Sequence, residues 1–565
     1  MSALTLLALL SHASAADWPA GATIDRAATA DITPEGFDAI AQIIPSMLPS
    51  SIDIPGMSDS YGYPDYCLGI EYSIQNMWAG IQVVSADITP GAGVLSISAD
   101  ILVNINNASD PFSLDFGGVL CISDSCGVYV EPFPVHIETT LGLAVVDDGA
   151  GGRMLDATVG PVAVEYDLSS DYIVGDCLTL DIINTLGLTD LLIGQLAGPL
   201  NDQIGSLGPT IESTIEDAFA AATITQDLDL NGVTAHIQLY PDAVDITTAG
   251  VRVTMAGGVS ADSATCVSAF DPGGSLKTET PPPEIGVAPS GVRSPFHIGL
   301  SLSDDFANQA IYAMWRGGLL CYTLEADNDT FPLDTSILNL LTGQAFTDVF
   351  PESGPLTLRT LPRTAPTVVY DGNHDIVVSI QDLDLEFYAD LDGRLTRVIS
   401  VGLAGPVGAD LVLDGATGNL GINLDINPEN LTPSVVFNEL HPEANDLILE
   451  SFGSTMSTLV GGVIGGLLGD LAFALPSFGG LGLQELDIAP TGTNADWLGA
   501  YAMVGPVTYG SADGGCGGCG GDTSGGGCDT SGCSSGTSCS TTGGIPLGLL
   551  GALPMGLAVL LRRRR

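Results

Sequence analysis

Long stretches of the chain alternate apolar and polar residues. In residues 95–105 every odd position is Leu, Ile, Ala or Val, and most even positions are polar. Residues 383–391 repeat the pattern with Leu, Leu, Phe, Ala and Leu. Because successive side chains of a strand point to opposite faces, these runs predict long β-strands with one buried face. Weaker runs predict further strands at residues 128–137, 139–146, 159–168 and 481–488.

Helical signals flank these strands. Thr33, followed by Pro34 and Glu35, has the residue types of a helix start, and Ser303 is predicted to cap a second helix. Apolar residues at helical spacing also predict long helices over residues 188–219 and 452–475. The order of early helix, long strands, late apolar helix and strand therefore occurs twice. The Pro- and Gly-rich residues 266–294 separate the two occurrences and predict a linker.

Both ends of the chain predict export. Residues 1–15 contain a short apolar run followed by Ala13-Ser14-Ala15, which is the layout of a signal peptide. Residues 510–544 are rich in Gly, Ser and Cys, residues 545–561 carry no charge, and residues 562–565 are all Arg. The Arg cluster predicts a short transmembrane segment with the body of the protein outside.

This order of segments resembles the MYXO-CTERM sorting tail of myxobacteria. The resemblance implies display at the cell surface or outer membrane and processing near Cys539, the cysteine closest to the span. Cys516 and Cys519 have the spacing of half a zinc site, which is the minor alternative because no histidine lies in this segment.

The net charge of −53 narrows the choice of partners. Lys and Arg number 14 in all, and four of them form the terminal cluster. Such a surface repels phosphate backbones, so nucleic-acid binding is excluded as a function class, and it also repels anionic membranes. A solvated acidic coat is the simplest interpretation.

Four stretches resemble one known family when they are taken in order. They are ITPEGFDAIAQIIPSMLPSSIDIPG (32–56), LNDQIGSLGPTIESTIEDAF (200–219), HIGLSLSDDFANQAIYAMWRGGLLCYTL (297–324) and FALPSFGGLGLQELDI (473–488). Together they are similar to the tubular lipid-binding proteins: bactericidal/permeability-increasing protein, lipopolysaccharide-binding protein and cholesteryl ester transfer protein. The resemblance covers about residues 25–505.

The resemblance implies an α+β fold with a boomerang-like shape. Two elongated antiparallel β-barrels, each wrapped on long helices, would be joined by a central sheet with a pseudo-twofold axis. Residues 25–265 would form the first barrel and its central-sheet strands, and residues 295–505 the second barrel.

The family also implies an apolar pocket in each half that holds lipid acyl chains. The same stripes have the spacing of ordinary helix cores, so core packing is an equal alternative. Carried onto this sequence, the candidate lipid-binding residues are Phe37, Ile40, Ile44, Met47, Leu192, Leu196 and Leu200 in the first half, and Phe306, Ile311, Met314, Trp315, Leu459, Val463 and Leu467 in the second.

One departure from the family limits the ligand. Members that bind lipopolysaccharide use a basic tip, and this chain has few basic residues to build one. Neutral or weakly charged lipids therefore fit better than phosphate-bearing ones.

The body of the chain contains an even number of cysteines, which in an exported protein predicts disulfides. Six cysteines allow 15 connectivities. One pairing would join Cys121 with Cys126, Cys67 with Cys177, and Cys266 with Cys321.

Enzyme signatures are missing from the sequence. It contains no G-x-S-x-G, H-E-x-x-H or Walker loop, and no two of its six histidines lie at helical ligand spacing. We therefore expect no enzyme, cofactor or metal. The acidic run of Asp382, Asp384, Glu386 and Asp390 is better read as a solvated strand face than as a calcium site, because a straight strand does not converge its ligands.

The sequence thus favours an exported, surface-displayed protein that binds or carries lipids or other apolar molecules. An adhesin or structural β protein with filled cores is the alternative. A secreted hydrolase is the third and weakest hypothesis.

Overall fold

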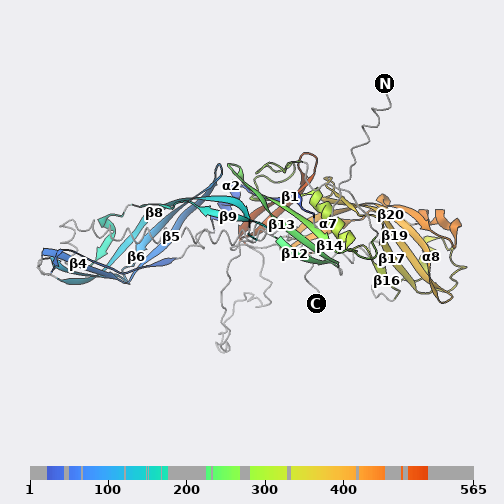
Figure 1. The fold of residues 1–565 in the computed structure, drawn as a ribbon, viewed down its shortest axis with the longest axis horizontal. Helices are drawn as coiled ribbons and strands as arrows, with labels where there is room; N and C mark the ends of the chain where they lie inside the picture. Colours follow the sequence, from blue (N-terminus) through green and yellow to red (C-terminus); the bar gives the residue numbers. More distant parts are fainter. Residues whose placement is uncertain are drawn as a thin grey trace, which may run out of the picture.

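Three β-sheets follow one another along an elongated molecule in the computed structural model (Figure 1). The structure describes residues 22–42, 50–64, 68–119, 123–147, 149, 152–166, 168–175, 224–230, 233–267, 280–326, 333–414, 419–451, 472–474 and 481–506.

The central sheet joins the two halves of the chain. Its strand order is β12-β13-β14-β1-β15-β25-β24, and every neighbouring pair is antiparallel. The first strand of each half, β1 and β15, pairs with the closing hairpin of its own half and with its counterpart. In chain order the strands are β1 (Ile24–Ile32), β12 (Ile224–Leu230), β13 (Val233–Thr247), β14 (Gly250–Ala261), β15 (Ile298–Ser303), β24 (Leu481–Thr491) and β25 (Trp497–Pro506).

The N-terminal sheet is built around one very long strand, β8 (Asp124–Asp147). Along one edge β8 pairs with β6 and then β7, and along the other with β9, β10 and β11. The other elements of this unit are β2 (Ser51–Ile54), β3 (Met57–Tyr63), β4 (Leu68–Gln75), β5 (Met77–Pro90), β6 (Leu95–Ile105), β7 (Phe112–Val119), β9 (Arg153–Val159), β10 (Ala163–Tyr166), the 3₁₀ turn η2 (Ser170–Tyr172) and β11 (Ile173–Gly175).

The C-terminal sheet is centred on the hairpin of β19 (Ile376–Leu391) and β20 (Arg394–Asp414), which turns at Asp392-Gly393. Asp392 and Gly393 both have positive φ, as such a turn requires. The other elements are β16 (Thr323–Leu324), β17 (Leu356–Pro362), β18 (Thr367–Val369), β21 (Asn419–Asp425), η3 (Pro428–Asn430), β22 (Thr432–Phe437), η4 (Pro442–Ala444) and β23 (Ala472–Ala474).

Short helices lie at the junctions of the sheets. Thr33 caps α2 (Pro34–Ala41), and Ser303 caps α7 (Asp304–Arg316), as their sequences predict. The helix α7 ends at Gly317, and Gly318 adopts φ of +89°. In the C-terminal unit α8 covers Ser336–Leu341, and residues 445–451 are also helical.

The predicted pair of barrels wrapped on long helices is wrong. Each sheet of the described residues is open and has two edges, and far more of these residues lie in strands than in helices. The described helices are short: α7 has 13 residues and α2 has eight. Most of the two segments predicted as long helices, 188–219 and 452–475, lies outside the described residues, and Ala472–Ala474 at the end of the second forms a strand.

The strand boundaries also need correction. The strands predicted at 128–137 and 139–146 are parts of the single strand β8. The register between β6 and β8 shifts between Val103 and Ile105, opposite Phe133 and Val130. This bulge places one extra residue in β8 and changes which alternate positions face inward. Alternation alone could not reveal it, because the apolar pattern breaks at the bulge.

A buried ion pair crosses the centre of the central sheet. Asp31 of β1 lies directly opposite Arg252 of β14, and both side chains are 8% exposed. The guanidinium donates from Nε to Oδ1 at 2.7 Å and from Nη2 to Oδ2 at 2.5 Å. This two-bond geometry matches the planar fork of arginine to the carboxylate.

Candidate functional site

The helix α2 packs between the N-terminal and central sheets. Phe37 is 5% exposed and lies in a cluster with Leu95 and Leu141 of the N-terminal sheet and Val251 of the central sheet. Ile40 packs partly buried against the same cluster. These two candidate lipid-binding residues therefore pack in the joint between the N-terminal and central sheets.

The helix α7 forms the corresponding joint with the C-terminal sheet. Phe306 packs onto central strands of the N-terminal half, in a cluster with Val233 and Val259. Ile311 faces a different cluster, with Tyr370 and Leu498.

The remaining candidates on α7 lie nearby. Trp315 is buried beside Tyr312, with ring centroids 5.6 Å apart, and Met314 is half-buried. The candidates on α7 therefore belong to several packed clusters rather than to one described cavity.

The other candidate residues cannot be placed. Ile44, Met47, Leu192, Leu196, Leu200, Leu459, Val463, Leu467 and Cys539 lie outside the described residues.

Sequence reasoning missed a continuous apolar strip along β8, whose side chains are buried in the described core. Inward-facing side chains from Val128 to Val145 belong successively to the core of the N-terminal unit, to the α2 joint and to the central sheet. Thr139 is the polar residue of the strip, and its hydroxyl donates to the Gly160 carbonyl at 3.1 Å. At ~3.3 Å per residue the strip is about 55 Å long. The sequence would have indicated this strip only if the strands predicted at residues 128–137 and 139–146 had been treated as one strand.

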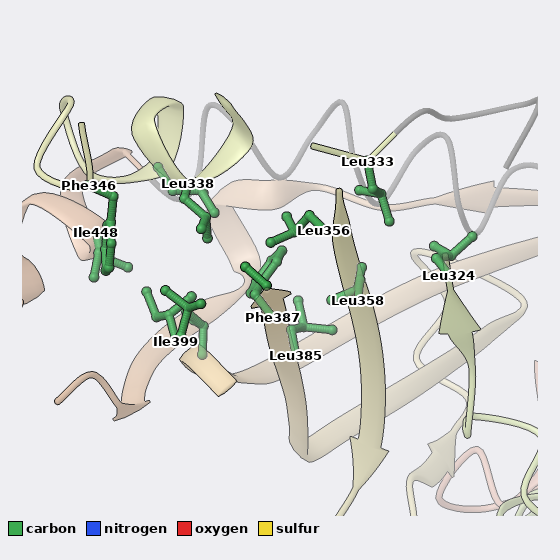
Figure 2. Close-up of a cluster of buried hydrophobic side chains, with 14 of the residues drawn as sticks. Leu324, Leu333, Leu338, Phe346, Leu356, Leu358, Leu385, Phe387, Ile399 and Ile448 are labelled. Atoms are coloured by element: carbon green, nitrogen blue, oxygen red, sulfur yellow. The ribbon is translucent and has the colours of Figure 1, made fainter. Parts of the chain in front are cut away.

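The C-terminal core is filled by its own chain. Phe387 of β19 and Leu338 of α8 are fully buried, and Phe346 and Ile448 close the same cluster from the side of the helices (Figure 2). The rings of Phe346 and Phe350 stack with centroids 6.3 Å apart. Short helical segments therefore cover the described core of the C-terminal sheet.

The acidic run on β19 is not a solvated face. Asp384 and Glu386 are 2% and 6% exposed, although Asp382 and Asp390 are exposed as predicted. Arg363 donates from Nε to Asp384 at 2.8 Å, and Arg397 from Nη1 to Glu386 at 2.7 Å. The solvated interpretation therefore fails for the two middle carboxylates, because arginines from outside β19 cover them.

A polar hollow lies at the far end of the N-terminal sheet. It has a volume of about 770 Å³ and is lined by strands β3, β4, β7 and β8. Five serines line it together with the carboxylates of Asp59, Glu71, Asp115 and Asp124. Within the described residues no group of three or more Asp, Glu, His or Cys side chains is arranged to hold a metal ion.

One of the three suggested disulfides is present. Cys266 and Cys321 are bonded, with Cα atoms 6.3 Å apart. Cys126 is also disulfide-bonded, whereas Cys67, Cys121 and Cys177 lie outside the described residues. Among the helices of the described part of the chain, none is long and apolar enough to cross a membrane.

Comparisons with known proteins give only distant likenesses. No protein-family model and no curated protein matches the sequence. The structure is similar to a crystal structure of lipopolysaccharide binding protein, with a TM-score of 0.46 and 14% identity over 86% of this chain and 100% of that one. It is also similar to P47 of Clostridium botulinum E1, with a TM-score of 0.26 and 10% identity over 85% of this chain and 99% of that one. Likenesses this weak say nothing about what this chain binds.

Proposed function

We propose that this protein binds lipids or other apolar molecules outside the cytoplasm, along the inner face of its N-terminal sheet. The observation that carries the proposal is the apolar strip of β8, which runs without a charged side chain from the tip of the sheet to the central sheet. Burial of apolar surface is the dominant driving force for binding such ligands.

The placement outside the cytoplasm rests on the sequence of the two ends. The Cys266–Cys321 disulfide supports it, because disulfides persist in oxidising compartments. Display at the surface through the C-terminal tail is part of the same proposal. The acidic composition favours neutral or weakly charged ligands, since residues 50–147 contain no Lys or Arg to pair with a phosphate.

Lipid extraction from the purified full-length protein tests the proposal. We expect organic solvent to release lipid that mass spectrometry detects at a fixed ratio to protein, and a fluorescent fatty acid to bind to the emptied protein. If neither occurs with folded protein, the proposal fails.

A matched pair of tryptophan substitutions tests the location. Val135 on the strip is 2% exposed, whereas Val84 on β5 is 63% exposed. Val135→Trp should lower the amount of bound lipid, and Val84→Trp should not. Should Val135→Trp not fold, a photoactivatable fatty acid should crosslink to peptides of β8 in the natural protein.

A ligand-free surface protein is the second candidate. The observation that supports it is that Leu338, Phe346 and Phe387 are fully buried against segments of the same chain. Absence of lipid from the protein, together with retained binding to cells or matrix, would decide for this alternative.

A further inference from the structure

A single histidine bridges two strands of the C-terminal sheet. His374 lies in the turn between β18 and β19, and Nδ1 is 3.2 Å from both carboxylate oxygens of Asp410 on β20. On the other side of the ring, Nε2 is 3.4 Å from Oδ2 of Asp425 at the end of β21. The imidazole uses both nitrogens, so only its protonated form can donate to both carboxylates.

The ring lies close to the backbone of β20 at Gly408. A Cβ atom at Gly408 would come within 2.5 Å of the His374 ring, so glycine is the residue that allows this approach. The side chain keeps 26% of its surface exposed, and solvent protons therefore reach it.

Further hydrogen bonds tie the same turn to β20. The backbone N–H of Asp375 donates to Asp410 Oδ1 at 3.2 Å, and the backbone N–H of Leu411 donates to Asp375 Oδ2 at 2.8 Å. Within the turn, Asp371 accepts from the N–H groups of Asn373 and His374.

Among the described residues, the charged groups around the imidazole are all carboxylates. Asp371 and Asp375 approach from its own turn, Asp410 from β20 and Asp425 from β21. A protonated His374 is the positive charge that holds these four together. Without its proton, the same carboxylates repel one another.

The turn is located where the C-terminal sheet meets the rest of the molecule. Its flanking residues Tyr370 and Ile376 pack in one cluster with Leu411 of β20, with Ile311 of α7 and with Leu498 of β25 in the central sheet. The turn is therefore flanked by residues that pack between the C-terminal sheet and the central sheet.

We propose that His374 is a pH-sensitive fastener of this joint, which holds the turn of residues 371–375 on β20 and β21 when protonated and releases it when the proton leaves. The hydrogen bond with Asp410, followed by the charges of Asp410, Asp425 and Asp371, raises the pKa of His374 above its ordinary value. With a raised folded-state pKa, the fastening is complete below the unfolded pKa of about 6.5 and is lost as the pH rises through the folded value.

Hydrogen exchange across pH 5 to 9 tests this proposal on the full-length protein. After correction for the intrinsic rate, protection of the Leu411 and Asp375 amides should fall about two- to fivefold as the pH rises, the range expected for a partly exposed ion pair. His374→Gln should show the low protection at every pH. His374→Lys, which keeps a positive charge, should retain protection at high pH.

The control is His236→Gln. His236 is exposed and contacts Asp227 at 2.6 Å in the β12–β13 hairpin, away from this joint. The variant should leave the pH profile of the Leu411 amide unchanged. A flat profile in the natural protein, or a His374→Gln profile that follows the natural one, would overturn the proposal.

Discussion

Thr33 and Ser303 occupy equivalent places in the two halves of the protein, and each donates its hydroxyl hydrogen to a backbone carbonyl of the other half. Thr33 Oγ1 donates to Phe296 O at 2.5 Å, with His297 O also 3.2 Å away, and Ser303 Oγ donates to Ala27 O at 3.1 Å. Each hydroxyl also accepts the backbone N–H three residues further along its helix. The two N-cap residues therefore hydrogen-bond each half of the protein to the other.

The strands before the caps share this relation. Ala30 of β1 pairs with Leu300 of β15, and the register is symmetric about that pair, with Ala28 opposite Leu302 and Ile32 opposite Ile298. A local twofold axis therefore passes between Ala30 and Leu300.

Removal of either cap hydroxyl should destabilise the whole protein. Thr33→Ala and Ser303→Ala should each lower the free energy of unfolding by about 1 to 2 kcal/mol, since each hydroxyl satisfies a helix N–H and a buried carbonyl. Chemical denaturation measures the change. Ser96→Ala, at an exposed position of β6, is the control and should have little effect.

Gly36→Ala should destabilise the protein although it lies inside α2. In an exposed helix, alanine would be favoured over glycine by about 1 kcal/mol. Here the new Cβ would lie 2.2 Å from the backbone oxygen of His297, which cannot rotate away. We expect a loss of at least about 2 kcal/mol in thermal or denaturant unfolding. Gly354→Ala, where nothing lies within 4 Å, should be neutral, and equal effects of the two would contradict the prediction.

Loss of one partner of the central ion pair should be severe. Asp31→Asn leaves the buried Arg252 guanidinium without its counter-charge, which costs about 3 to 5 kcal/mol in comparable pairs. Joint replacement, Asp31→Leu with Arg252→Met, should cost much less, because no buried charge is left. Denaturation of both variants gives the comparison, and equal losses would show that the pair does not act through its charge.

The Cys266–Cys321 disulfide should stabilise the fold substantially. It spans 55 residues, and closing a loop of that size in the unfolded chain is worth about 4 kcal/mol in the chain-entropy account. The double variant Cys266→Ser with Cys321→Ser should melt at a lower temperature than the natural protein without reductant. An unchanged melting temperature would mean that the bridge is strained or that the unfolded chain is already restricted.

His136 should make stability depend on pH at the other end of the molecule. Its ring lies 2.7 Å from Asp100 and 3.1 Å from Glu138, and hydrogen bonds to these carboxylates raise the pKa of His136. The contribution is present below the unfolded pKa and declines as the pH rises through the folded value. The stability difference between natural protein and His136→Gln should therefore shrink between pH 6 and 9. NMR titration of the ring measures the pKa itself.

Local signals in the sequence were sufficient where neighbouring residues determine the structure. The predicted caps Thr33 and Ser303 are both confirmed, because the relevant contacts lie within a few residues. Alternation on β19 also placed Leu383, Leu385, Phe387 and Ala389 correctly on the buried face.

Features that depend on distant residues could not be predicted. Asp384 is covered by Arg363, which lies 21 positions away. The sequence of β19 alone therefore indicated an amphipathic strand with Asp384 on its solvated face. The bulge in β8 is set by its pairing with β6. Phe37 and Phe306 were correctly expected to be apolar-facing, but the sequence did not show that their helices bind neighbouring sheets. The candidate site shifted accordingly, from helix stripes to the strip on β8.

The covalent bridge also determines what a cut in the Pro-rich stretch would do. Cys266 stands at the start of this stretch, shortly after β14, and Cys321 follows α7 of the C-terminal half. A protease that cleaved between residues 268 and 279 would therefore yield two fragments still joined by sulfur, by the β1–β15 pairing and by α7 seated on the other half. The nicked protein would migrate as one species until it was both reduced and denatured.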